Sequence, residues 1–133
     1  MFGWEEMAQD ASRVYHDLDQ AVQSRTIIYG GGYSHTATLN FYRKKYDYPE
    51  VYSLSNSFLF WAPKNLDFDY QIEVDDSRQT SSAYFSSVQV LDSIENKYAR
   101  EKGFIYFKSG PKMDLQSTWN NLIDRRRERF TRD

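Results

Sequence analysis

The fold is decided by the stretch Thr26-Ile27-Ile28-Tyr29-Gly30-Gly31-Gly32-Tyr33-Ser34. Its first four residues favour a β-strand, and the three glycines that follow them stop that strand. Ser34 can then cap a helix that runs to about Tyr46, where Asp47-Tyr48-Pro49 forms a turn. A strand, a glycine turn and a helix in this order are typical of an α/β domain.

An amphipathic helix precedes this stretch. Apolar residues recur at spacings of three and four over about residues 4–24, so one face of the helix is apolar. The residues of that face are Trp4, Met7, Ala8, Ala11, Val14, Tyr15, Leu18, Ala21 and Val22.

Further strands and one more helix follow the turn. Residues 51–53 and 58–61 are predicted to be short extended or turn segments, and 75–82 a loop or a short helix. Strands are predicted near 68–74, 88–94 and 104–107, and Asp114 can cap a last helix that turns Leu115, Trp119, Leu122 and Ile123 inward. Strands that alternate with helices predict a three-layer, Rossmann-like α/β domain with a mainly parallel sheet, on which the N-terminal and C-terminal helices pack.

The composition fits one globular domain over residues 1–133, since 40% of the residues are hydrophobic and 27% are charged. The net charge of −2 gives no general attraction to nucleic acid, and no apolar run approaches the roughly 20 residues of a membrane helix. Glu5, Glu6 and Asp10 interrupt any apolar core of a signal peptide, so the chain as given is expected to be soluble. Its many aromatic residues can form a tyrosine-rich core or leave rings for an interface.

The glycine turn is the first candidate site. Backbone N–H groups at the start of a helix can hold a phosphate, which makes Gly31, Gly32 and Ser34 weak candidates for an anion site. The spacing matches neither the dinucleotide-binding pattern nor a P-loop. The alternative is a tight strand-to-helix turn in which the glycines adopt positive φ angles.

Acidic residues and histidines give no stronger candidate. Asp67-Phe68-Asp69 has the D-x-D pattern with which many nucleotide-sugar transferases hold a divalent metal, although carboxylates flanking a strand usually face solvent. Asp75-Asp76 is interpreted in the same way, and His16 and His35 lack partners at metal-ligand spacing. We therefore expect no catalytic, metal-binding or cofactor-binding residue in this chain.

The arginines Arg125-Arg126-Arg127 and Arg129 form the only concentrated charge in the sequence. The dipole of the last helix favours positive charge at its C-terminal end, where these arginines lie. If the domain lies against a bilayer, they could instead contact phospholipid headgroups.

Three stretches, taken together, resemble one family. Residues 33–42 are similar to a "Y-G-x-A-x-A-[LI]-x-[FY]-Y" helix, and residues 48–63 to an "L-P-x-V-x-S…N-x-[YF]-x-x-W-G-P" segment. Residues 103–119 are similar to a closing strand, an "R-G-P-K" turn and an "L-x-x-x-W" helix. These motifs are those of the soluble C-terminal domain of dolichyl-phosphate-mannose mannosyltransferase-like and aminoarabinose transferase-like enzymes of glycosyltransferase family 39 and its relatives. Ser34, Ala62 and Ser109 depart from the pattern, and the matching positions include Tyr33, Ala37, Leu39, Tyr42, Pro49, Ser53, Trp61, Pro63, Gly110, Pro111, Lys112 and Trp119.

The resemblance covers residues 26–123 and implies a preceding transmembrane region, from which residues 1–24 would lead into the domain. It implies an accessory extracytoplasmic domain of a bacterial membrane glycosyltransferase that uses a polyprenyl-phosphate sugar, at the periplasmic face of the inner membrane. The catalytic acidic residues of such enzymes lie between transmembrane helices, so the domain is expected to be inactive alone. Its expected partner is the transmembrane region of its own chain, with the carrier sugar or the acceptor nearby.

The residues of the resemblance are expected to be structural, with Trp61 and Trp119 as core anchors and Pro49 at a strand entry. Two alternatives remain open. One is a free-standing Rossmann-like module that binds a phosphorylated small molecule at the glycine turn, and the other is a protein-interaction domain that uses surplus tyrosines.

Overall fold

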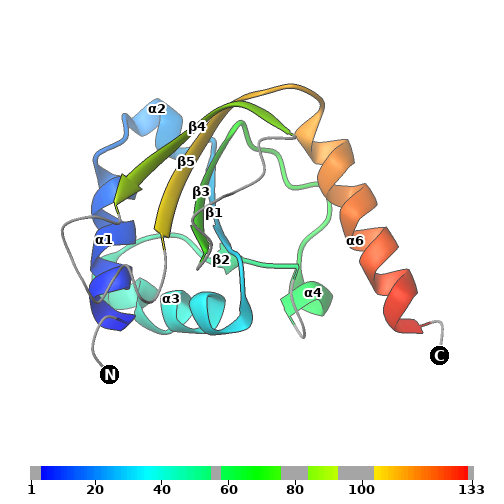
Figure 1. Cartoon of the computed structure of the whole chain (residues 1–133), viewed down its shortest axis with the longest axis horizontal. Coiled ribbons are helices and arrows are strands. Elements are labelled where there is room, and N and C mark those ends of the chain that lie inside the picture. The colour runs from blue at the N-terminus through cyan, green and yellow to red at the C-terminus, as the bar shows by residue number, and fades with distance from the viewer. Residues whose placement is uncertain (1–3, 55–57, 76–83, 93–103, 132–133) are drawn as a thin grey trace.

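A five-stranded mixed sheet forms the centre of the protein in a computed structural model that describes residues 4–54, 58–75, 84–92 and 104–131 (Figure 1). The strands lie in the order β2-β1-β3-β5-β4. β1 pairs in parallel with β2 and β3, whereas β5 is antiparallel to both β3 and β4. Their bounds are Thr26–Gly30 for β1, Val51–Tyr52 for β2, Tyr70–Asp75 for β3, Phe85–Asp92 for β4 and Phe104–Pro111 for β5.

The prediction of a mainly parallel, Rossmann-like three-layer domain is therefore wrong. Parallel neighbours need a crossover connection, usually a helix whose apolar stripe covers the sheet. α3 is such a helix between β1 and β2, but the sequences before β4 and β5 are polar or charged, with few apolar residues. The second half of the sheet accordingly consists of antiparallel pairs.

Helices lie on both faces of this sheet (Figure 1). The helix predicted over residues 4–24 is instead two helices, α1 (Trp4–His16) and α2 (Gln20–Gln23). The break falls at Asp19, which has extended backbone angles, and the Gln23 amide donates to the Tyr15 and Leu18 carbonyls at 3.1 and 3.0 Å. The other helices are α3 (Tyr33–Tyr46), α4 (Phe58–Trp61) and α6 (Leu115–Thr131).

Two hydrophobic cores meet at β1, because successive residues of a strand point to opposite faces. Ile28 belongs to the core under α1 and α3, and Ile27 belongs to the core under α4 and α6. The first core is Met7, Ala8, Ala11, Val14, Ile28, Leu39, Tyr48, Val51, Ile72, Val74 and Ile105. The second is Ile27, Leu54, Leu59, Ala62, Phe68, Phe85, Leu115, Trp119 and Ile123.

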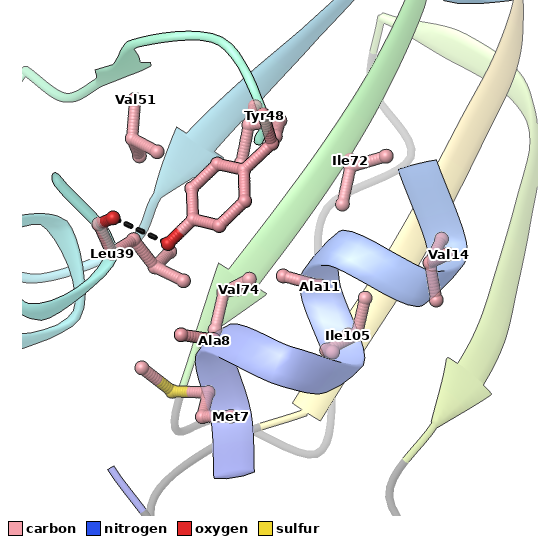
Figure 2. Packing of buried hydrophobic residues seen from close by; sticks show 11 residues of the cluster. Met7, Ala8, Ala11, Val14, Leu39, Tyr48, Val51, Ile72, Val74 and Ile105 are labelled. Atoms are coloured by element: carbon pink, nitrogen blue, oxygen red, sulfur yellow. Dashed lines mark hydrogen bonds between the residues drawn. The ribbon is translucent and has the colours of Figure 1, made fainter. Parts of the chain in front are cut away.

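Tyr48 brings a polar group into the first core (Figure 2). Its ring lies among apolar side chains between α3 and the sheet, and its hydroxyl donates a hydrogen bond to the Leu39 carbonyl. Burial raises the pKa of this hydroxyl, because a phenolate would lose its hydration there. The bond ties the turn after α3 back onto that helix.

Replacing Tyr48 with phenylalanine should lower the free energy of unfolding by about 1–2 kcal/mol, because the buried Leu39 carbonyl would lose its side-chain donor. Urea unfolding of Tyr48→Phe tests this. Tyr33→Phe is the matched control, since the Tyr33 side chain is exposed, and it should change stability by less than about 0.5 kcal/mol. Equal effects of the two variants would contradict the prediction.

Candidate functional site

The glycine turn needs its glycines for space. A Cβ on Gly30 would lie 2.1 Å from Thr36 Oγ1, and one on Gly31 would lie 2.4 Å from the carboxyl carbon of Asp75. The expectation of positive φ in this turn is wrong, since only Gly110 among the described glycines has a φ in that region, at 67°. Only a residue without a side chain allows α3 to approach the ends of β1 and β3 so closely.

This arrangement does not favour an anion at the turn. Gly32 is the N-cap of α3, and Ser34 is exposed in the first turn of the helix. The Asp75 carboxylate, however, lies against Gly31, so a phosphate that approached the turn would meet a like charge. The three candidates Gly31, Gly32 and Ser34 are therefore neighbours on the chain, and Gly31 lies beside the acidic side chain of Asp75.

The D-x-D residues bind an arginine of the same chain. Arg25 Nη2 lies 2.8 Å from Asp67 Oδ1, and its Nε lies 2.9 Å from Asp69 Oδ2. The hydrogen bond from Arg25 holds the pKa of Asp67 below its usual range, and the two carboxylates raise the pKa of Arg25. The contact joins the start of β1 to the segment that enters β3, so the pair has a structural role.

The other polar candidates are separate from one another. His16 Nε2 lies 2.6 Å from the Asp47 carbonyl oxygen, and the buried His35 ring lies 5.7 Å from the Trp4 ring between centroids. Asp76 lies outside the described residues. Within the described ranges, no group of three or more His, Asp or Glu side chains is placed to hold a metal ion.

A buried ion pair was missed by sequence reasoning. Lys108 Nζ lies 3.0 Å from Glu73 Oε1, and the Gln71 amide donates to the same oxygen at 3.0 Å. The side chains are only 6% and 10% exposed. The alternation along β3 correctly indicates that Glu73 lies on the opposite face of the sheet from Ile72 and Val74. That opposite face is also covered, so Glu73 is buried.

Removing one partner of this pair should be more harmful than removing both. Lys108→Met leaves the Glu73 carboxylate buried without its counter-charge and should cost about 3–5 kcal/mol in unfolding free energy. The double variant Glu73→Leu/Lys108→Met should recover most of that loss. Chemical denaturation of the single and double variants measures the difference, and equal losses would show that the two charges are not coupled.

The residues of the family resemblance divide into buried and exposed groups. Trp119 is 4% exposed, packs its ring against Tyr29, Tyr52 and Phe68, and donates from Nε1 to the Pro63 carbonyl at 2.7 Å. Leu39 and Ser53 are also buried, and Ala37, Tyr42, Pro49 and Pro63 are half-buried, whereas Tyr33, Trp61, Gly110, Pro111 and Lys112 are exposed.

Trp61 is the clearest correction, because it is 80% exposed and the prediction that it anchors the core is wrong. The segment 58–61, predicted to be extended or a turn, is the single-turn helix α4. That turn buries Leu59, and Ala62 follows it into the core, so Phe60 and Trp61 face outward. Sequence alone does not show which side of one helical turn is buried.

Four rings on α3 and α4 are exposed, and we call them the aromatic edge: Tyr33, Phe41, Phe60 and Trp61. They are 51%, 78%, 53% and 80% exposed. The two helices lie along the same side of the molecule, at the bottom of Figure 1. The Tyr33 ring lies 5.3 Å from the Phe58 ring between centroids, which joins the start of α3 to α4. Large exposed apolar side chains on two helices along one side of a domain are a candidate interaction site.

Arg127 of α6 holds α4 in place from behind. Its Nη2 donates to the carbonyls of Leu59, Phe60 and Ala62 at 3.2, 3.4 and 3.1 Å. These carbonyls belong to α4 and the residue after it, and within the segment the Leu59 carbonyl also accepts from the Ala62 N–H at 3.4 Å. The cation therefore fixes the backbone that carries Phe60 and Trp61. One helical turn further toward the start of α6, Ile123 packs in the same core as Leu59.

The neighbouring Arg126 also points inward. It donates from Nη1 to the Leu54 carbonyl at 3.2 Å. Burial raises the pKa of the nearby Tyr29 hydroxyl, and the Arg126 charge opposes that shift. Two of the four arginines thus hold the loop segments that precede and follow α4, whereas Arg125 and Arg129 are exposed.

The chain matches no protein-family model, no curated protein and no solved structure. Among the described residues, no helix is both long and apolar enough to cross a membrane.

The two tryptophans should respond differently to truncation. Trp119→Ala removes a buried ring and its hydrogen bond and should cost about 3–5 kcal/mol in unfolding free energy. Trp61→Ala should change stability by less than about 0.5 kcal/mol, because its ring is largely in solvent. Thermal and urea unfolding of both variants test this. A sharp loss of stability in Trp61→Ala would restore its proposed role in the core.

Proposed function

We propose that this protein is the accessory, extracytoplasmic domain of a membrane glycosyltransferase that uses a polyprenyl-phosphate sugar. The domain would lie at the periplasmic face of the bacterial inner membrane and dock on the transmembrane region of its own chain. The mannosyltransferase-like class follows from the resemblance over residues 26–123. The aromatic edge is the observation that carries the docking role, because its four rings are exposed on a domain whose two cores are formed by other residues.

The arrangement of the helices suits attachment at that surface. α1 begins and α6 ends on the side of the molecule along which α3 and α4 lie (Figure 1). A transmembrane segment that preceded Trp4 would therefore join the domain beside the aromatic edge. Trp4 itself is not free to enter a membrane boundary, since it packs against His35 and the first core.

The polar side chains of the described residues support an accessory role over a catalytic one. The D-x-D carboxylates bind Arg25, the Glu73 carboxylate binds Lys108, and the Asp75 carboxylate lies at the glycine turn. A module that binds a phosphorylated small molecule at the turn is disfavoured by the mixed sheet and by that last carboxylate. The aromatic edge also suits a second candidate, a domain that binds a separate protein.

Crosslinking in the full-length membrane protein tests the docking role. Single cysteines are placed at Ser34, in the first turn of α3, and at Arg125, just past the middle of α6, and both side chains are exposed. Ala21 on α2 is the matched control, because it is exposed on the opposite side of the molecule (Figure 1).

We expect the Ser34→Cys and Arg125→Cys variants to crosslink to the outward-facing loops and Ala21→Cys to react much less. Deletion of the domain should abolish or strongly reduce sugar transfer. A domain that crosslinks nowhere, and whose deletion leaves transfer intact, would exclude the accessory role and favour the separate protein partner.

A further inference from the structure

We propose that two copies of this chain associate through β4, with the two β4 strands antiparallel across a two-fold axis. The sheet would then continue from one copy into the other. The proposal is independent of the proposed function, because β4 lies at an edge of the sheet and carries none of the four rings of the aromatic edge.

β4 is an edge strand of eight residues. The strand order β2-β1-β3-β5-β4 places it last, and β5 is its only neighbour among the strands that the structure describes (Figure 1). Along an antiparallel strand, backbone N–H and C=O groups point alternately toward the neighbour and away from it, so about half of those in β4 face outward. A row of outward-facing groups is a template on which a further strand can pair.

The opposite edge of the sheet is closed by a side chain. β2 has only two residues, and the Asn40 side-chain amide donates to the Val51 carbonyl at 3.0 Å. The Asn40 side-chain oxygen also accepts from the Val51 N–H at 2.9 Å. Asn40 therefore occupies the backbone groups with which a further strand would pair. Within the described part of the chain, no side chain makes a corresponding pair of hydrogen bonds to the backbone of β4.

The sequence of β4 favours pairing. The segment from Phe85 to Leu91 contains no charged residue, no proline and no glycine, and Asp92 is the only charged residue of the strand. Edge strands that avoid pairing commonly carry charges or proline. One protective feature is present, because the register with β5 is irregular between Val90 and Asp92. This irregularity confines regular pairing to about residues 85–90.

Symmetry is the argument for a second copy as the partner. Across a two-fold axis each residue of the strand meets residues of the same strand, so a charged strand would repel itself. An axis near Val88 or Gln89 places Asp92 opposite the uncharged residues 84–86 of the other copy. The net charge of −2 also gives little repulsion between two copies.

The capped edge limits the size of the assembly. Antiparallel pairing uses the free edge of β4 in both copies, and Asn40 closes the β2 edge in each of them. An isologous contact of this kind ends at the dimer, whereas a sheet with two open edges could extend into a fibre.

Analytical ultracentrifugation of the 133-residue protein tests the proposal. One strand pair makes a small interface, so we expect the sedimentation coefficient to rise from that of a monomer toward that of a dimer over about 10–500 µM. Hydrogen exchange of the backbone amides in residues 85–90 should slow over the same range, because outward-facing N–H groups gain acceptors.

A matched pair of charge substitutions tests the location of the contact. Gln89→Lys should weaken dimerisation at least about tenfold, because like charges meet across the axis. The Gln89 side chain is exposed, so the monomer should fold normally, and added salt should restore part of the association by screening the lysines. Asn121→Lys is the control, since it makes the same change at an exposed position of α6 and should leave dimerisation unchanged.

Single cysteines locate the axis. The chain has no cysteine of its own, so a cysteine placed at Ser86, Ser87, Val88 or Gln89 can form a disulfide only with another copy. Opposed residues of an antiparallel pair have Cβ atoms close enough for a disulfide. Under mild oxidation we therefore expect the position nearest the axis to crosslink much faster than Asn121→Cys does.

Two outcomes would overturn the proposal. A protein that stays monomeric over the whole concentration range does not pair through β4 with its own copy, and a strand of a separate protein becomes the better occupant. A dimer that Gln89→Lys leaves intact, or that Phe60→Ser/Trp61→Ser dissociates, would place the interface outside β4. The crosslinks at Ser34 and Arg125 in the full-length protein are expected whichever result is obtained, so the two proposals are judged separately.

Discussion

The close approach of α3 to the end of β1 is the constraint on which the rest of the structure depends. Gly30 has no side chain, and the space that a Cβ would need is filled by Thr36 Oγ1, which in turn donates to the Gly32 carbonyl at 2.8 Å. This contact sets where α3 leaves the strand. As a result Leu39 packs in the same core as Ile28, and the start of the helix lies against α4. Gly30 thereby helps to position both the first core and the helix that carries Tyr33 and Phe41.

In the other half of the molecule, side chains of α6 hold segments that have little regular structure. Trp119 donates to the Pro63 carbonyl, and Asn120 both accepts from the Asn65 backbone N–H at 2.8 Å and donates to its side chain at 2.9 Å. Asn65 has a left-handed φ of 61°, a conformation that needs such compensation. Further along α6, Arg127 holds the end of α4. The segment that presents Trp61 is therefore fixed by side chains of one long helix.

Local features of the fold could be predicted because they depend on near neighbours in sequence. The strand at Thr26, the helix that ends near Tyr46 and the Asp114 cap, whose carboxylate accepts from the Gln116 N–H at 3.2 Å, are of this kind. The direction of strand pairing could not be predicted, since it depends on how distant segments meet. The same is true of burial: Glu73 and Trp61 each follow a correct local pattern, yet tertiary contacts bury the charged residue and expose the aromatic one.

The contrast between these two residues bears on function. A buried carboxylate is tolerated at Glu73 because Lys108 and Gln71 compensate it within the domain. Trp61 is not buried: it remains 80% exposed, while Arg127 holds the backbone next to it. Folding would gain free energy by turning this ring inward, so its exposure is not explained by the stability of the domain. Rigid presentation of an apolar ring is instead what an interface requires, because little conformational entropy is then lost on contact. We therefore propose that the exposed rings serve in docking, and α6, the helix that completes the second core, holds the backbone of α4 that carries two of them.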